Sequence, residues 1–212
     1  MSYSNHQIYT YKGKEVPSVT TILKIINKPA LVYWSNWLGY QGLKYKEVLN
    51  DKADIGTRVH AAVEADIKKY LYIPIPYPND EVIARYHRFL EFKDDNKFEP
   101  IFVEKSITSS EYGGTVDCYC KLNGKFTIID WKTSKDFYPT MFIQLAAYRK
   151  LLHDNAYTVD QAGIVLLHED KYKIKVLTLE ELDIYYEIFN NAKGLFQKIE
   201  NANILNKFIE KD

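Results

Sequence analysis

Cysteine is scarce in this 212-residue chain, in which Cys118 and Cys120 are the only two. Their spacing puts both on one face of a strand, where a disulfide between them would have poor geometry. Two thiolates also cannot supply a four-cysteine zinc or iron–sulfur site. The pattern therefore predicts buried core cysteines, a reducing cytoplasmic compartment and no iron–sulfur cluster.

Long apolar runs and an excess of one charge are also absent. No stretch of about 18 apolar residues predicts a membrane span, and residues 1–10 lack the basic start and apolar stretch of a signal peptide. The 28 basic and 28 acidic residues give a net charge of zero, which argues against a polycation that coats nucleic acid but allows a local basic groove. Arginine occurs only four times, so phosphate contacts would fall mostly to lysine.

Aromatic residues are abundant, with eighteen Tyr, ten Phe and three Trp. Most are expected in the core, although some could stack on unpaired bases. Trp34 and Trp37 lie in a helix predicted from residue 29 or 30 towards residue 39. We expect core anchors there, and a base-stacking surface is the alternative.

Hydrophobic periodicity and turn residues predict the order of elements along the chain. They are a strand pair in 7–16, helices 19–26 (capped by Ser18) and 29–39, a helix 54–70, an extended connector 73–80, a helix 81–96 capped by Asp80, a strand 101–108, a hairpin 115–122 and 125–131, a helix 140–153, strands 163–168 and 172–178, and a helix 179–208. This order is typical of an α/β or α+β domain with a central mixed sheet of about five strands flanked by helices. The length favours a single domain, with residues 1–50 as an N-terminal helical elaboration of a core formed by 51–212.

The hairpin carries the main chemical signal. Asn123-Gly124 favours a two-residue type I′ turn, and that register places Asp117 opposite Asp130. Cross-strand partners have Cβ atoms about 4.5–5.5 Å apart, so two facing carboxylates destabilise a sheet unless a cation lies between them. Lys132 follows on the same face as Asp130 because strand side chains alternate. The hairpin thus predicts a divalent-metal site beside a lysine.

The acid–any residue–lysine pattern alone is weak, because it occurs five times. The copies are Asp66/Lys68, Glu91/Lys93, Asp95/Lys97, Asp130/Lys132 and Glu169/Lys171. Only the fourth ends an apolar strand with another aspartate set opposite by a turn. A solvated hairpin with incidental acids is the alternative interpretation.

Further candidate residues lie on neighbouring elements. His60 and Glu64 share a helix face, where a lone histidine is usually structural or solvated, and Glu64 could cap, pair with Lys68 or orient the imidazole. Glu104, on the strand before the hairpin, is a candidate ligand or supporting group, with a surface glutamate as an equal alternative. Gln144 and Tyr148 lie one turn apart and face the same way.

Taken together, these residues resemble the PD-(D/E)XK nuclease superfamily, and within it the RecB-like exonuclease branch that includes phage exonucleases and the mitochondrial genome maintenance exonuclease. Four motifs carry the resemblance, in the family's order and spacing over roughly residues 50–180. They are Gly56-Thr57-Arg58-Val59-His60, Gly114-Thr115-Val116-Asp117, Asp130-Trp131-Lys132-Thr133 and Gln144-Leu145-Ala146-Ala147-Tyr148.

The resemblance implies a restriction-endonuclease-like core and a DNA nuclease that uses one or two Mg²⁺ or Mn²⁺ ions. It implies metal ligation by His60, Asp117, Asp130 and the main-chain carbonyl of Trp131, and catalysis by Asp117, Asp130 and Lys132. Thr133, Gln144 and Tyr148 would contact the DNA backbone or support the site. Glu64 and Glu104 stay the candidate supporting groups named above. The fused helicase motifs and cluster cysteines of some family members are absent from this chain.

The expected substrate is DNA. The expected activity is that of an exonuclease that prefers single-stranded ends. A structure-specific endonuclease of the same fold, a module that binds DNA ends or a protein without cutting, and a metal-free structural domain are the alternatives. A replication or recombination protein is a further candidate partner. The oligomeric state, the polarity of digestion and the choice between DNA and RNA stay open.

Overall fold

The computed structural model describes residues 7–69 and 79–202. Its elements are β1 (Tyr9–Tyr11), β2 (Lys14–Val16), α1 (Val19–Leu23), α2 (Pro29–Tyr40), α3 (Tyr45–Ile67), α4 (Asp80–Asp95), β3 (Phe98–Thr108), β4 (Gly113–Leu122), β5 (Lys125–Lys132), α5 (Pro139–Asp154), β6 (Gln161–Leu167), β7 (Tyr172–Leu177) and α6 (Leu179–Asn201). The predicted order of helices and strands is confirmed.

Five strands form the central sheet in the order β3-β4-β5-β6-β7. All neighbours are antiparallel except β5 and β6, which run parallel because α5 connects them across the sheet. The sheet is therefore mixed and flanked by helices, and the α+β fold class is confirmed. The short pair β1 and β2 forms a separate two-stranded sheet.

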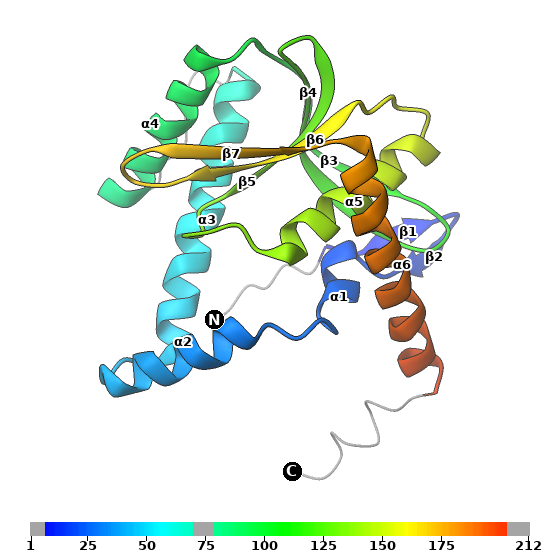
Figure 1. Ribbon diagram of the computed structural model, residues 1–212, viewed down its shortest axis with the longest axis horizontal. Helices are drawn as coiled ribbons and strands as arrows, with labels where there is room; N and C mark the ends of the chain where they lie inside the picture. The colour runs from blue at the N-terminus through cyan, green and yellow to red at the C-terminus, as the bar shows by residue number, and fades with distance from the viewer. Residues whose placement is uncertain (1–6, 70–78, 203–212) are drawn as a thin grey trace.

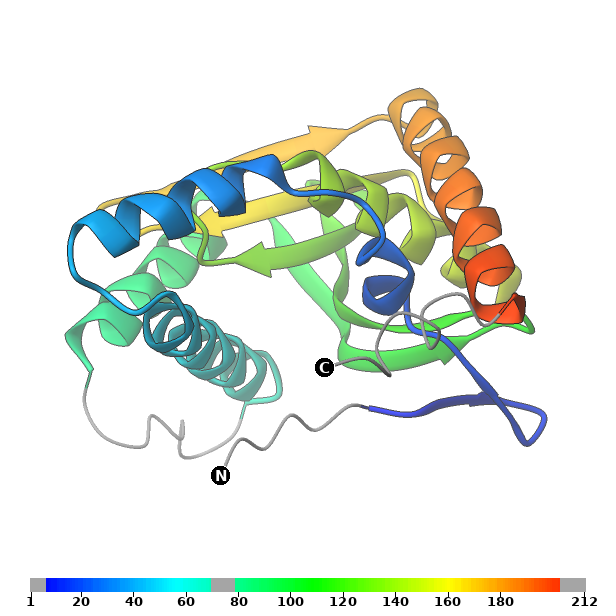
Figure 2. The ribbon, with the colours of Figure 1, turned by 90° about the horizontal axis from the view of Figure 1, so that it is seen from below.

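Helices cover both faces of the central sheet (Figure 1). Buried side chains of α3 and α4 form one apolar core with the strands, and those of α1, α5 and α6 form a second core on the other face. Figure 2 shows α6 at the end of the molecule opposite α3 and α4. The sheet is thus the middle of three layers, as expected when both of its faces are apolar.

The β4–β5 hairpin has the predicted turn. Asn123 (φ 53°) and Gly124 (φ 86°) both lie in the left-handed region, as a type I′ turn requires. Leu122 pairs with Lys125, which is the predicted register. Cys118 and Cys120 are buried in the core beside α3 and α4, as expected.

Several helix boundaries differ from the prediction. α1 ends at Leu23, and α3 begins at Tyr45, nine residues before the predicted start. The first half of α3 has no buried side chain, so it lacks the apolar period by which a helix is recognised in sequence.

The predicted cap of α4 was one residue too late. Asn79 is the cap, because its side chain accepts a hydrogen bond from the Val82 N–H at 3.1 Å, and Asp80 is the first helical residue. Residues 73–78 of the predicted connector, and the predicted end of the last helix at 203–208, lie outside the described residues.

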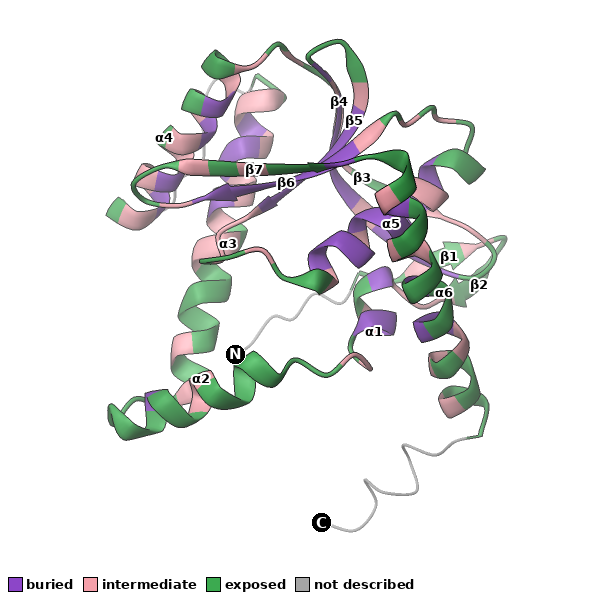
Figure 3. Cartoon of the chain, viewed as in Figure 1, coloured by how far each residue is buried: buried purple, intermediate pink, exposed green. Residues whose placement is uncertain are grey.

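The prediction for α2 was wrong in part. Trp37 is 54 % exposed rather than a core anchor, whereas Trp34 is half-buried and packs edge-on against Tyr45. Figure 3 shows exposed residues along almost the whole of α2, which packs chiefly against α3. Among the described helices, none is both long and apolar enough to cross a membrane.

Candidate metal centre

The candidate site lies where β4 and β5 separate. Their ladder ends at the pair Cys118–Ile129. Beyond this pair β4 continues beside β3, and β5 continues beside β6. Asp117 and Asp130, which were expected to face each other, are the first residues beyond the end of the ladder, one on each arm of this fork.

The fork is held by a side chain instead of by a strand pair. Asp117 Oδ2 accepts a hydrogen bond from the Trp131 N–H at 3.0 Å, and the Asp117 side chain is largely buried. A carboxylate therefore occupies the place of the next backbone acceptor. This position fixes its orientation at the mouth of the fork.

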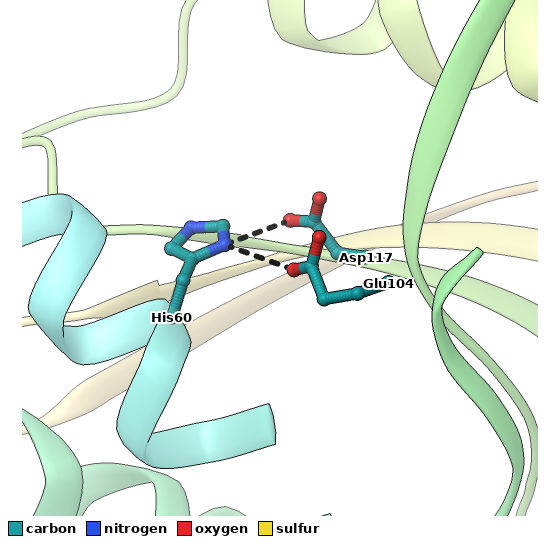
Figure 4. A group of neighbouring side chains, drawn as sticks. All are labelled: His60, Glu104 and Asp117. Carbon is teal, nitrogen blue, oxygen red and sulfur yellow. Dashed lines mark ion pairs between the residues drawn. The ribbon is translucent and has the colours of Figure 1, made fainter. Parts of the chain in front are cut away.

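His60 reaches the fork from α3. Val59 and Val63 pack α3 against the sheet, and the imidazole Nε2 lies 2.9 Å from the Trp131 carbonyl oxygen. The other ring nitrogen, Nδ1, lies 3.6 Å from a carboxylate oxygen of Asp117 and 3.6 Å from one of Glu104 (Figure 4).

Glu104 enters the cluster through an unusual backbone conformation. It has φ +50°, in the left-handed region that a non-glycine residue adopts only at a cost of about 1 kcal/mol or more. It also interrupts the β3–β4 ladder, in which the neighbouring pairs are Val103–Cys118 and Lys105–Val116. Its half-buried carboxylate, one ring nitrogen of His60 and one oxygen of Asp117 lie within 4.8 Å of one another.

Asp130 and Lys132 form an ion pair next to this cluster. Asp130 is 1 % exposed, and its Oδ2 lies 2.5 Å from Lys132 Nζ. Its Oδ1 is buried and has no hydrogen-bond partner among the described residues. Asp130 is not in the group of ligand atoms that lie within 4.8 Å of one another, which consists of His60, Glu104 and Asp117. One imidazole and two carboxylates this close together are a donor set that fits a hard divalent cation.

The electrostatics of the site reflect this crowding of acids. Burial of the imidazole lowers the pKa of His60, but the Asp117 charge and the nearby Glu104 carboxylate outweigh it and raise the pKa to about 9. Burial raises the pKa of Asp130 to about 6 although Lys132 opposes this rise. Burial lowers the pKa of Lys132, but Asp130 and Asp117 outweigh it and raise that pKa above its ordinary value. These shifts have one common cause, the closeness of three carboxylates to one imidazole and one ammonium.

The glycines of the first two motifs pack closely against residues of the other two motifs. A Cβ on Gly56 would lie 3.3 Å from Thr133 Oγ1, and a Cβ on Gly114 would lie 2.5 Å from the Tyr148 ring. Tyr148 is buried, and its hydroxyl accepts a hydrogen bond from Gln144 Nε2 at 2.8 Å. Close packing thus explains both glycines.

A hollow of about 500 Å³ opens beside His60. It is lined by Ala53, Gly56, Thr57, His60, Ala61, Glu64 and Glu104. Glu64 pairs with Lys68 at 2.5 Å, and the two imidazole nitrogens face other groups. Of the roles considered for Glu64, pairing with Lys68 is the one present here.

Arg85 was not among the functional residues predicted from the sequence. Its buried guanidinium donates to the main-chain carbonyls of Leu167 (2.6 Å) and Thr133 (3.2 Å), and it pairs with Glu81 at 2.7 Å. It therefore ties the carboxyl ends of β5 and β6 to α4. The signal was present, because Arg85 interrupts the apolar stripe formed in α4 by Val82, Phe89 and Phe92.

Comparison with known proteins gives similarity of structure only. No family model and no curated protein matches the chain. The crystal structure of SSO0001 is similar with 16 % identity and a TM-score of 0.43, covering 89 % of this chain and 79 % of that one. An alkaline exonuclease from Laribacter hongkongensis is similar with 8 % identity and a TM-score of 0.42, covering 89 % and 94 %. Its complex with dAMP gives 12 % identity and a TM-score of 0.36, covering 70 % and 96 %.

Proposed function

We propose that the chain is a metal-dependent nuclease that hydrolyses phosphodiester bonds in DNA, as an exonuclease that prefers single-stranded ends. The observation that carries this proposal is the fork between β4 and β5, which gathers His60, Glu104 and Asp117 next to the Asp130–Lys132 pair. The motif resemblance to RecB-like nucleases supports the same function.

The ligands of the proposed centre are His60 Nδ1, Glu104, Asp117 and the free oxygen of Asp130. A ligating histidine usually donates its other ring N–H to a carbonyl or carboxylate. The contact of His60 Nε2 with the Trp131 carbonyl supplies such an acceptor. We therefore assign the Trp131 carbonyl the role of orienting the imidazole, in place of its expected role as a ligand.

A bound Mg²⁺ or Mn²⁺ would polarise the scissile phosphate and lower the pKa of the attacking water. Lys132, whose ammonium pairs with Asp130, would offset the negative charge that develops on the phosphate. Asp130 holds the Lys132 ammonium within 2.5 Å and so fixes its direction. Gln144, Tyr148 and Thr133 are the proposed contacts or supports for the DNA backbone.

The test follows end-labelled linear single-stranded, linear duplex and circular DNA with Mg²⁺ or Mn²⁺. Asp117→Asn, Asp130→Ala and Lys132→Ala should each slow hydrolysis by at least about 100-fold, as loss of charge stabilisation does in other enzymes. Lys97→Ala is the matched control, because Lys97 belongs to another acid–any residue–lysine copy and is exposed. Undiminished hydrolysis by the Asp130 or Lys132 variant would refute the site.

The same assay separates the alternatives. Cleavage of circles would support a structure-specific endonuclease over an exonuclease. DNA binding without hydrolysis under any metal would support a non-cleaving module. Glu104→Gln should weaken metal binding measured by calorimetry, whereas Glu99→Gln, on the exposed part of the same strand, should not.

A further inference from the structure

Three exposed aromatic side chains lie on one face of α2. Tyr33, Trp37 and Tyr40 are 77 %, 54 % and 82 % exposed. Their spacing of four and then three residues aligns them along the helix over about 10 Å. The adjacent face, about 100° round the helix, holds the buried Leu38 and the Trp34 ring that packs on Tyr45. The three aromatic residues, called here the aromatic stripe, are therefore not part of that packing.

The segment around the aromatic stripe is strongly biased in charge. Residues 16–46 contain no Asp or Glu in a chain that has 28 of them. The same segment contains Lys24, Lys28, Lys44 and Lys46, all exposed, of which Lys44 pairs with Glu47. In the sequence the stripe is thus preceded and followed by lysines, a charge that fits a negatively charged partner.

The helix that carries the aromatic stripe directly precedes the helix that carries His60. α2 leads directly into α3, and the hollow beside His60 extends along α3 to Ala53. Tyr45 and His60 are fifteen residues apart, or about 22 Å along the helix axis. A strand of several nucleotides spans such a distance.

We propose that the aromatic stripe of α2 binds single-stranded DNA by stacking on its bases, while the flanking lysines contact its phosphates. Aromatic rings next to positive charge are the combination that binds unpaired strands without sequence preference. Paired bases in a duplex have their faces covered, so the stripe selects the single strand. This inference rests on the proposed function in naming DNA as the substrate that is led towards the fork.

The experiment measures binding in the absence of hydrolysis. The full chain in EDTA is titrated into a fluorescein-labelled oligothymidylate of about 15 nucleotides, a length within the usual site size, and anisotropy is followed. Trp37→Ala and the double variant Tyr33→Ala/Tyr40→Ala should each weaken binding by about tenfold or more. Tyr33→Phe/Tyr40→Phe keeps both rings and should bind like the unchanged chain.

The matched control removes exposed apolar surface elsewhere. Ile184 and Ile188 of α6 are 61 % and 42 % exposed, and Ile184→Ala/Ile188→Ala should leave the affinity unchanged. An abasic strand of equal length should bind about as weakly as the alanine variants do. Lys24→Gln/Lys28→Gln should reduce the salt dependence of binding, because fewer counterions are released.

Four results would overturn the proposal. They are unchanged affinity in the alanine variants, equal binding of the abasic strand, a change only in self-association by sedimentation, and a change only in binding to phosphatidylglycerol vesicles. Failure of the proposed function is a different result, because it would appear as no hydrolysis of any DNA by the unchanged chain with Mg²⁺ or Mn²⁺, whereas the affinity in EDTA tests the aromatic stripe. Equal melting temperatures of all variants would exclude unfolding as the cause.

Discussion

α2 and α5 are both largely apolar helices that begin with proline, yet only one of them is covered. α5 buries nine of its sixteen residues, whereas α2 buries one of twelve. α5 lies against the central sheet and α6, while α2 packs chiefly against the exposed half of α3. Apolar composition therefore does not decide how far a helix is buried. Folding alone does not explain the exposed aromatic surface of α2.

The largest difference should appear in core truncations. Leu145 of α5 is fully buried, so Leu145→Ala should lower the free energy of unfolding by about 2–5 kcal/mol. Leu31 of α2 is 40 % exposed, and Leu31→Ala should cost under about 1 kcal/mol. Urea unfolding measures both values, and equal losses would contradict the contrast between the helices.

Replacing glycine by alanine should change the free energy of unfolding in opposite directions at two positions. Gly114→Ala should cost about 1–3 kcal/mol, since the new Cβ would meet the ring of Tyr148 in α5. Gly39, within α2, has open space around its Cβ position, and Gly39→Ala should stabilise the chain by up to about 1 kcal/mol. Thermal unfolding measures whether each substitution stabilises or destabilises the chain. A stabilising Gly114→Ala would mean that Tyr148 does not pack there.

The two tryptophans of α2 should differ from each other. Trp34→Ala removes the edge contact with Tyr45 and should cost about 1 kcal/mol. Trp37→Ala removes a ring that is 54 % exposed and should cost under about 0.5 kcal/mol. Equal losses in urea unfolding would show that the exposed face of α2 is packed in solution.

The smallest effect should depend on pH. Burial raises the pKa of Glu81, but Arg85 and Lys52 outweigh it and lower that pKa below its usual value. This interaction stabilises the folded chain above the unfolded pKa and is lost as pH falls through the folded pKa. Glu81→Gln should therefore reduce stability at pH 7, by about 1 kcal/mol or less, and have little effect near pH 3.

Glu180→Gln is the control for this pH dependence, because Glu180 is exposed at the start of α6.

α2 carries no acidic residue. The protection of its own amides against hydrogen exchange, corrected for intrinsic exchange, should therefore not change between pH 3 and 7. A loss of protection confined to α2 at low pH would contradict this expectation.

Local signals predicted most of the fold. The Asn123-Gly124 turn determined the register of the hairpin, and the alternation of strands and helices predicted the mixed sheet. Helix starts without an apolar period were not predictable in this way, and neither was the exposure of Trp37, which depends on distant packing.

Part of the candidate site could also be predicted. The residues Asp117, Asp130, Lys132 and His60 are close together at the fork, and their roles stay predictions. The position of Glu104 follows from a left-handed backbone conformation that glutamate rarely adopts. Arg85 depends on carbonyls that are 48 and 82 residues away in sequence. Neither the position of Glu104 nor the contacts of Arg85 could be predicted from the local sequence pattern.

The contact between Gly114 and Tyr148 has a consequence for how such sequences diverge. The two positions share one volume, because a side chain at residue 114 would occupy the space of the Tyr148 ring. A lineage that gains a side chain at position 114 would therefore need a smaller residue at position 148. In relatives of this chain, the two positions are expected to change together, as are positions 56 and 133.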